Sequence, residues 1–327
     1  MLGHAIIPVM KKIYLAPLEG ITDYVYRNTF CNYYGGVDKY YTPFLSPNST
    51  HKFTTKEINN IDPNKNDVDT LVPQLLSNNA EHFLWAIKEI SKLGFGEINL
   101  NLGCPSGTVV AKRKGSGLLF YPELLDQVLY EIFDGVGSLK NKPAISVKTR
   151  LGKNEPEEFY EILDIYNKYP IYELTIHPRI QTDFYNGSVR MDFFEYAVAK
   201  CNIPIVYNGD ITSSAAALTI ENKYPAINAI MIGRGLISNP TLAATIKSEA
   251  TSVKETEFNK AAFWDFHDEL LDQYQELLSG ETPLLHRLKE FWQFWQINFP
   301  NEAKTIKKIH KCKKLVEYQS AISPLRN

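Results

Sequence analysis

The chain has 327 residues, of which 44% are hydrophobic and 22% charged, and its formal net charge is −2. This composition is typical of a globular chain long enough for a barrel of about 250 residues and a smaller appendage, and it excludes nucleic-acid binding through overall positive charge. No apolar run approaches the ~20 residues of a membrane span, and residues 1–7 lack a basic segment and a cleavage signal, so we expect a cytoplasmic protein with no membrane association.

Short apolar runs recur along the first 240 residues. They are almost continuously apolar, which is typical of parallel strands covered on both faces. The second run is rich in Tyr and Pro and is the least regular. The eight runs are residues 13–18, 37–45, 70–76, 97–103, 144–148, 173–177, 203–207 and 229–233.

Segments with helical periodicity alternate with these runs. Ala80, Phe83 and Ile87 share one helical face, and Gly94 stands where such a helix would stop. The same spacing recurs over residues 124–132 and 159–166. Eight strands alternating with helices predict an α/β fold, the (β/α)8 TIM barrel.

The pattern changes after about residue 250, where strand signals disappear. Residues 258–278, 284–299 and 302–318 predict three helices, with Gly280 and Pro300 as breaks. We therefore predict two domains: a catalytic TIM barrel over residues 1–250 and a small all-helical C-terminal domain over residues 251–327. The aromatic side chains expected in the core of the helical domain are Phe291, Trp292, Phe294 and Trp295.

The four cysteines, Cys31, Cys104, Cys201 and Cys312, are widely spaced and form no C-x-x-C pair. This spacing argues against an iron–sulfur cluster, a zinc ribbon and a disulfide scaffold. We expect no metal.

Polar side chains stand at the ends of several predicted strands. Cys104 follows the fourth strand within residues 101–105 (NLGCP), and Gln74, Lys148 and His177 close strands that are otherwise apolar. The active site of a barrel lies at the carboxyl ends of its strands. We expect these four side chains to meet at one rim.

Two glycine-containing loops follow the seventh and eighth strands, at residues 208–210 (NGD) and 233–235 (GRG). Loops at these places in barrels bind phosphate through backbone N–H groups, and Arg234 would add a fork of donors. No G-x-G-x-x-G follows a strand, and there is no Walker loop. A phosphate site beside Lys, Gln, His and a thiol suits FMN, with Lys148 stabilising the negative charge of the reduced ring.

Seven motifs occur in a fixed order across residues 13–240, and a further segment lies in the C-terminal part. They are residues 16–23 (APLEGITD), 73–75 (PQL), 101–105 (NLGCP) with 115–119 (GSGLL), 147–150 (VKTR), 177–179 (HPR), 208–211 (NGDI), 231–235 (MIGRG) and, in the C-terminal part, 286–289 (HRLK). In this order they resemble the tRNA-dihydrouridine synthases, FMN-dependent reductases of uridine in tRNA. The chain departs from the commoner family pattern at Leu18 and Glu19, at Ser77 and after Arg179.

The resemblance implies roles for the matching residues. Cys104 is expected to be the general acid that protonates C5 of uracil, while flavin N5 donates hydride to C6. A thiol with a pKa of about 8.5 is mostly protonated near neutral pH and still gives up its proton readily. Asn101 and Arg179 are expected to contact the target base. The expected FMN contacts are Ala16, Pro17, Leu18, Gln74, Lys148, His177, Asn208, Gly209, Asp210, Gly233 and Arg234.

The resemblance also implies tRNA as the substrate and NADPH as the electron donor. A stacked uridine must be extruded into the pocket, so RNA backbone contacts are needed around its mouth. Lys112, Arg113 and Lys114 follow the Cys104 motif and are candidate contacts, and six lysines lie within residues 304–314. We expect the protein to act as a monomer.

Three other functions fit parts of the pattern. One is an FMN barrel that acts on a small pyrimidine, similar to dihydroorotate dehydrogenase, which would not need a basic helical tail. Another is a tRNA-binding protein without catalysis, which the presence of Cys104 and Lys148 disfavours. The third is a barrel lyase that uses Lys148 as a Schiff-base amine.

Overall fold

The structure is a computed structural model, and it describes residues 11–249 and 258–326. The residues before Lys11, where no targeting segment is expected, lie outside these ranges, as does the predicted domain boundary at residue 250. No helix in the two described ranges is long and apolar enough to cross a membrane.

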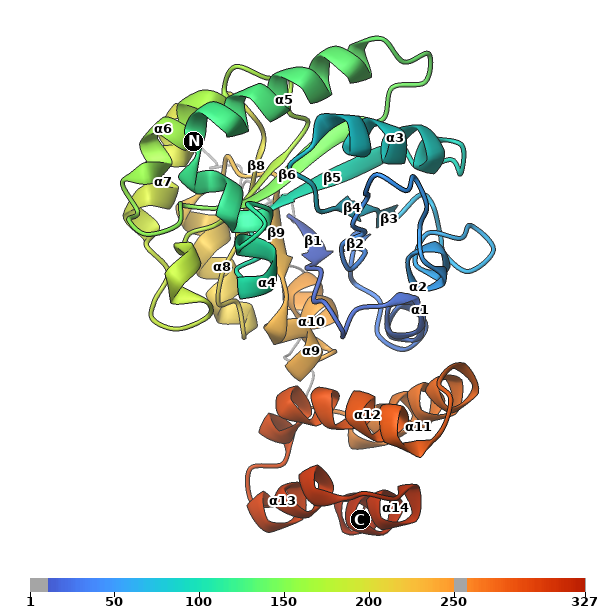
Figure 1. The fold of residues 1–327 in the computed structure, drawn as a ribbon. Coiled ribbons are helices and arrows are strands. Elements are labelled where there is room, and N and C mark those ends of the chain that lie inside the picture. Colours follow the sequence, from blue (N-terminus) through green and yellow to red (C-terminus); the bar gives the residue numbers. More distant parts are fainter. Residues whose placement is uncertain (1–10, 250–257, 327) are drawn as a thin grey trace, which may run out of the picture.

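Parallel strands form a barrel at the centre of the molecule (Figure 1). Their order around the sheet is β3-β2-β1-β9-β8-β7-β6-β5-β4, as the alternating sequence pattern predicts. The strands are β1 (Lys12–Leu15), β2 (Lys39–Tyr41), β3 (Leu71–Val72), β4 (Gln74–Leu75), β5 (Glu97–Leu102), β6 (Ala144–Arg150), β7 (Leu174–His177), β8 (Ile205–Asn208) and β9 (Ala229–Ile232).

The third predicted strand closes the barrel in two halves around Pro73. Its first half, β3, pairs with β2, and its second half, β4, pairs with β5. Proline has no N–H to donate to a neighbouring strand, and this separates the two halves. The Pro73 carbonyl still accepts a hydrogen bond from the N–H of Asn99 at 2.9 Å. The predicted second strand is shorter than expected and keeps only an isolated bridge between Leu45 and Leu75 beyond Tyr41.

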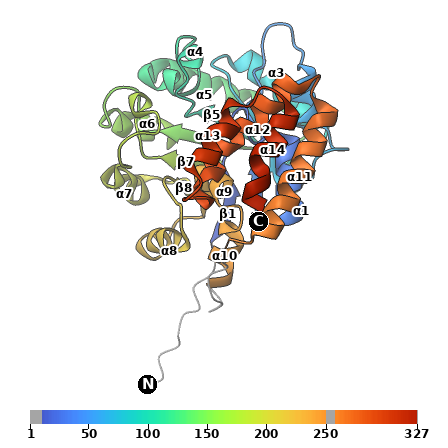
Figure 2. The ribbon, with the colours of Figure 1, turned by 90° about the horizontal axis from the view of Figure 1, so that it is seen from below.

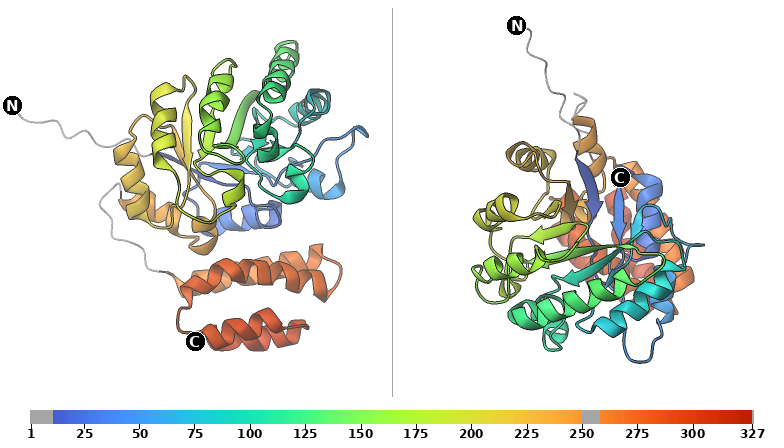
Figure 3. Two further views of the ribbon diagram at one scale, coloured as in Figure 1. Left: turned by 60° about the vertical axis from the view of Figure 1, so that its left-hand side comes forward. Right: turned by 90° about the horizontal axis from the view of Figure 1, so that it is seen from above.

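Helices surround the strands (Figures 1 and 3). In α3 (Ala80–Ser91) the Asn79 side chain caps the first turn by accepting a hydrogen bond from the N–H of His82 at 2.8 Å. Phe83 and Ile87 of this helix are fully buried in the core. The helices and 3-10 turns around the barrel are α1 (Tyr24–Tyr33), α2 (Thr55–Asn59), α3 (Ala80–Ser91), α4 (Gly107–Val110), η1 (Gly115–Phe120), α5 (Pro122–Gly137), α6 (Glu158–Tyr166), η2 (Gln181–Asp183), α7 (Met191–Lys200), α8 (Ser214–Lys223), α9 (Arg234–Ser238) and α10 (Leu242–Glu249).

The C-terminal residues 258–326, here called the helical region, contain no strand and pack beside α1 and α9 (Figures 1 and 2). The contact with the barrel is aromatic: the Tyr26 ring lies 5.3 Å from the Phe291 ring and 5.8 Å from the Phe266 ring, between centroids. Its elements are α11 (Lys260–Leu277), α12 (Glu281–Trp295), η3 (Gln296–Asn298), α13 (Ala303–Lys311) and α14 (Leu315–Arg326).

The prediction of one helix over residues 302–318 is wrong, because the chain breaks there into α13 and α14. Cys312 takes an extended conformation with ψ of 138°. The carboxylate of Glu317 then accepts from the N–H groups of Lys313, at 2.8 Å, and Lys314, at 3.4 Å. Lys313 and Lys314 directly precede α14, and Glu317 is its third residue. A glutamate at this position that reaches back to the N–H groups before a helix favours a new helix start over continuation of the old helix.

Candidate active site

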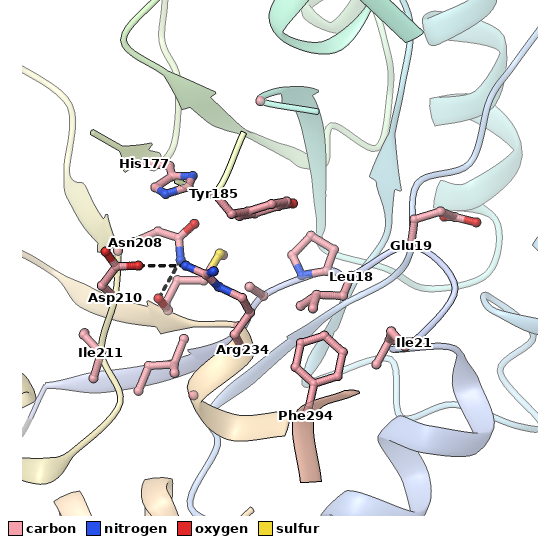
Figure 4. Close-up of a pocket in the computed structure, with 18 of the residues that line it drawn as sticks. Leu18, Glu19, Ile21, His177, Tyr185, Asn208, Asp210, Ile211, Arg234 and Phe294 are labelled. Atoms are coloured by element: carbon pink, nitrogen blue, oxygen red, sulfur yellow. Dashed lines mark hydrogen bonds and ion pairs between the residues drawn. The ribbon is translucent and has the colours of Figure 1, made fainter. Parts of the chain in front are cut away.

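A pocket of about 1120 Å³ opens at the carboxyl ends of the barrel strands, and α12 and η3 border it (Figure 4). It brings together most of the site residues predicted from the sequence, which come from the first to the last strand. The predicted residues that line it are Ala16, Pro17, Leu18, Gln74, Asn101, Cys104, Lys148, His177, Asn208, Gly209, Asp210, Gly233 and Arg234. Arg179, Lys112, Arg113 and Lys114 were also predicted and do not line it.

Cys104 lies in a turn that hydrogen bonds hold from two sides. The Asn101 side-chain oxygen accepts from the N–H groups of Gly103, at 3.0 Å, and Cys104, at 2.9 Å. The Cys104 carbonyl accepts from the N–H and the hydroxyl of Ser116. Gly115 has a φ of +56°, and a Cβ there would lie 2.8 Å from the Cys104 carbonyl oxygen, so the approach of this loop requires glycine.

The Cys104 thiol is half-buried, and burial raises its pKa above the ordinary value of a cysteine. The nearby charges of Arg150 and Lys148 act in the opposite direction but do not outweigh burial. The thiol therefore stays protonated near neutral pH, which is the form that a proton donor needs.

Lys148 reaches the pocket from β6, as does Arg150 two residues further on. Burial, with a smaller contribution from the charge of Arg150, lowers the pKa of its amine to about 7. Within residues 11–249 and 258–326 no hydrogen-bond acceptor pairs with its Nζ. An amine in this setting favours an anionic or carbonyl group as its partner.

His177 and Arg179 form a buried pair at the end of β7. Arg179 Nη1 lies 3.0 Å from His177 Nε2, and because a guanidinium can only donate, this nitrogen accepts and the ring proton is on Nδ1. Burial, followed by the charges of Arg150 and Lys148, lowers the pKa of His177 well below its ordinary value. His177 is therefore a neutral imidazole at the pocket wall.

Arg179 lies behind this wall, with 1% of its surface exposed. It forms an ion pair with the carboxylate of Asp210 and donates to the carbonyls of Asn186 and Gly187. Its predicted contact with the target base has no support in this placement, because partners within the chain already engage Nε, Nη1 and Nη2. The sequence pattern alone could not distinguish a buried arginine from one that faces a ligand.

Two residues outside the predicted set occupy central positions. Arg150 is 1% exposed and donates to the carbonyls of Gly103, Ile180 and Phe184, so it ties the Cys104 turn to the loop after β7. Tyr185 is half-exposed, lines the pocket, and has the guanidinium groups of Arg150 and Arg234 at 5.4 and 5.1 Å from its ring centroid. Arg150 belongs to the predicted VKTR motif, which could have singled it out; Tyr185 lies in a loop with no sequence signal.

The loops after β8 and β9, where the sequence predicts a phosphate site, lie side by side at the pocket because their strands are paired. Asn208 donates to the Met231 carbonyl at 2.8 Å, and Arg234 donates to Asp210 at 2.8 Å (Figure 4). A Cβ at Gly233 would lie 3.3–3.4 Å from the side chains of Leu18 and Ala16, so glycine lets the end of β9 pack closely against the residues that follow β1.

The helical region supplies the remaining wall through Glu290, Gln293, Phe294 and Ile297. Phe294 was predicted to lie in the helical core, but it is half-buried and lines the pocket (Figure 4). The core prediction is confirmed for the other three aromatics, which are fully buried: Phe291, Trp292 and Trp295.

The basic residues after the Cys104 turn lie outside the pocket. Lys112 and Arg113 are exposed, and Arg113 lies over the Tyr121 ring at 4.6 Å. Lys114 is half-buried, and burial lowers its pKa. In the described part of the chain no three His, Cys, Asp or Glu side chains are grouped to hold a metal ion.

Comparison with known proteins agrees with this geometry. Residues 14–323 match the family model described as dihydrouridine synthase (Dus). The chain belongs to the dihydrouridine synthase family. As a member of this family it is a flavin-dependent oxidoreductase.

Curated relatives of this dihydrouridine synthase family member cover most of the chain. It is 27% identical to tRNA-dihydrouridine(16) synthase of Vibrio vulnificus over 320 residues, which are 94% of this chain and 96% of that protein. It is 30% identical to tRNA-dihydrouridine synthase B of Pasteurella multocida over 239 residues, 73% of this chain and 69% of that protein. A probable tRNA-dihydrouridine synthase of Staphylococcus aureus is 30% identical over 69% of this chain and 68% of its own length.

Solved structures with the same fold include other barrels. Histamine dehydrogenase from Rhizobium sp. 4-9 aligns with a TM-score of 0.54 at 13% identity, over 79% of this chain and 49% of that one. Morphinone reductase in complex with tetrahydroNAD aligns with a TM-score of 0.51 at 12% identity, over 77% and 90%. At this identity the likeness establishes the TIM-barrel fold of the dihydrouridine synthase and nothing further.

Proposed function

We propose that this dihydrouridine synthase reduces specific uridines in tRNA to 5,6-dihydrouridine, with FMN as its cofactor and NADPH as the electron donor. The observation that carries the proposal is one pocket that holds both a protonated thiol, Cys104, and an amine, Lys148, that has no acceptor among the described residues. Both lie at the strand ends beside a wall from the helical region. Only a substrate that reaches both the barrel and the helices would use all of these walls.

The residues present fit FMN. Lys148 Nζ has no acceptor among the described residues, and an anionic ring edge would supply one. Asn208, Gly233 and Arg234 line the pocket, and the Arg234 guanidinium and the Asn208 amide would supply donors for a phosphate. We propose that the full cradle is Ala16, Pro17, Leu18, Gln74, Lys148, His177, Asn208, Gly209, Asp210, Gly233 and Arg234. When bound, FMN supplies the hydride for C6 of the uracil ring.

Cys104 is the proposed general acid at C5 of the base. Its raised pKa keeps a proton on Sγ near neutral pH, and its thiol still releases that proton more readily than a serine hydroxyl would. Arg150 and the Asn101 side chain hold the turn on which the thiol stands. These contacts support a fixed position for Sγ relative to the pocket.

The RNA is proposed to lie across the mouth of the pocket, with the target uridine extruded into it. The half-exposed ring of Tyr185 offers a flat surface for stacking near the mouth. Lys304, Lys307, Lys308 and Lys311 lie on α13, and Lys307 and Lys311 line a groove of about 440 Å³ beside η3. We propose that residues 251–327 form a tRNA-binding domain and residues 1–250 the FMN-binding barrel, with Lys112, Arg113 and Lys114 as further contacts to the RNA backbone.

A direct test compares three electron acceptors with the purified protein, which we expect to be yellow: unmodified tRNA, free uridine and orotate. We expect dihydrouridine to form in tRNA and little turnover of the two small pyrimidines, because they contact only the barrel wall. Preferred reduction of orotate would instead favour a barrel acting on a small pyrimidine, and a colourless protein would favour a tRNA-binding protein without catalysis. Faster flavin reduction by NADPH than by NADH would support the proposed donor.

A further inference from the structure

A row of buried polar side chains crosses the inside of the barrel. Gln74, Asn99 and Ser146 lie side by side in register on β4, β5 and β6, and each is at most 1% exposed. The interior of a TIM barrel is usually filled by bulky aliphatic side chains. Buried amides and hydroxyls are costly unless every one of them is hydrogen-bonded, so this row needs a reason.

The orientation of the row is set at the Cys104 turn. Asn101 Oδ1 accepts from the backbone N–H groups of Gly103 and Cys104. A backbone N–H can only donate, so the Asn101 oxygen must face the turn and its Nδ2 must face away. Nδ2 donates to Gln74 Oε1 at 2.7 Å.

The same polarity continues into the barrel. Because Gln74 Oε1 accepts, its Nε2 is the end that donates to Asn99 Oδ1, at 2.8 Å. Asn99 Nδ2 in turn donates to the Ser146 hydroxyl at 2.9 Å. We call Asn101, Gln74, Asn99 and Ser146 the amide relay.

Only half of the amide relay reaches the pocket. Asn101 and Gln74 line it, whereas Asn99 and Ser146 do not. Asn99 and Ser146 therefore act on the pocket only through their neighbours. Gln74 retains one N–H and one lone pair outside the relay, and the relay decides which end of its amide lies nearer the Cys104 turn.

We propose that Asn99 and Ser146 are positioning residues, which through the amide relay hold the Cys104 turn and fix the amide orientation that Gln74 presents to the pocket. The inference rests on the proposed function for the reaction that the thiol serves. The relay itself consists of this chain's own residues, so its effect on the thiol can be measured without turnover.

The test uses the flavin-containing protein with Asn99→Leu, which keeps the branched shape of the side chain, is somewhat larger, and has no hydrogen-bonding group. Asn99→Asp is the matched variant, because a carboxylate keeps the acceptor for Gln74 and can accept from the Ser146 hydroxyl. The rate of alkylation by iodoacetamide is followed by peptide mass spectrometry at Cys104 and, as an internal reference, at the exposed Cys31 on α1.

Asn99→Leu removes both relay bonds of Asn99, the one from Gln74 and the one to Ser146. We expect it to raise the ratio of Cys104 to Cys31 alkylation about fivefold, which is the effect of about one net hydrogen bond on the stability of the turn. Asn99→Asp should leave the ratio close to that of the unsubstituted protein. In tRNA reduction, kcat of Asn99→Leu should fall about tenfold with KM unchanged, because the relay touches no part of the RNA. An Asn99→Leu protein that matches the unsubstituted protein in both measurements would overturn the proposal.

Two further outcomes, a misfolded Asn99→Leu variant and a failure of the proposed function, can be distinguished from a failure of this proposal. If Asn99→Leu does not fold, Ser146→Ala removes only the last acceptor of the relay; a rise of about twofold in the alkylation ratio is expected, and an unchanged ratio overturns the proposal. If the unsubstituted protein fails to reduce uridine in tRNA, the proposed function fails, while the alkylation ratios still decide the role of the relay.

Discussion

Arg179, which lies behind the pocket wall, forms an ion pair with Asp210, which lines the pocket, and this pair joins the loop after β7 to the loop after β8. Asp210 also accepts from Arg234 at 2.8 Å, so one carboxylate organises two arginines from separate motifs. The pair explains why an arginine with 1% exposure is tolerated there, since its charge is matched and its donors are engaged.

Replacing Asp210 by Asn should destabilise the protein by about 2 kcal/mol, because the buried Arg179 would lose its counter-ion. Burial alone would raise the pKa of Asp210, but its hydrogen bond from Arg179 and the charge of Arg234 outweigh this and lower it. The carboxylate thus stabilises the fold above the ordinary pKa of Asp, about 4, and loses this effect as pH falls through the lowered pKa. Urea unfolding at pH 7 and at low pH checks this: the penalty should shrink in acid, and exposed Asp164→Asn should show none.

Replacing Cys104 by Ala should keep the bound flavin and slow uridine reduction by about 10² to 10⁴-fold, the usual contribution of a general acid. Flavin absorbance and dihydrouridine formation in tRNA are the two measurements. Cys201→Ala, which alters a half-buried thiol at the end of α7, is the control and should behave as the unsubstituted protein. A decrease of only about twofold in the Cys104 variant would remove the thiol from the acid role.

The pH dependence of uridine reduction should follow the Cys104 thiol. Because burial raises its pKa, the donor form persists above the usual thiol range near 8.5, and the rate should fall only as pH rises through the raised value. Single-turnover reduction of tRNA by the pre-reduced enzyme between pH 6 and 10 measures this directly. A fall that begins near neutral pH would contradict the raised pKa.

Lys148 should contribute to FMN binding only while it is charged. Its pKa of about 7 means that the amine is protonated at pH 6 and largely neutral at pH 8. The substitution Lys148→Met should therefore weaken FMN binding to the flavin-free protein most at pH 6 and less towards pH 8. The measured quantity is the Kd of the variant for FMN divided by the Kd of the unsubstituted protein. Quenching of flavin fluorescence gives both values, and a ratio that is constant with pH would show that the charge of Lys148 plays no part in binding.

Replacing Lys307 and Lys311 together by Ala should weaken tRNA binding and reduce its salt dependence, by about one unit of log–log slope for each RNA phosphate that the lysines no longer neutralise. Both side chains are exposed on α13. The matched control is Lys140→Ala with Lys142→Ala, two exposed lysines just before β6, at the other end of the strands from the pocket. If tRNA binding and its salt slope survive the α13 substitutions, the groove beside η3 does not hold the RNA backbone.

The fold could be predicted from the sequence because its determinants are local and periodic. Apolar runs such as residues 229–233, and a helical face such as Ala80, Phe83 and Ile87, report burial directly. The helix break at Cys312 escaped prediction because the residue responsible, Glu317, acts backwards on Lys313 and Lys314 through hydrogen bonds that have no periodic signature.

The sequence by itself determined which chemical groups stand at the ends of the strands, since a Cys, Lys or His that closes an apolar strand must face the same rim as its neighbours. Which side chains face the pocket was decided only by the tertiary structure: Arg179 lies behind the wall, Tyr185 lines the pocket, and Asn99 joins Gln74 to Ser146 outside it. The physical reason is that strand periodicity sets the direction of a side chain, whereas its hydrogen-bond partners come from distant segments that only the folded chain brings together.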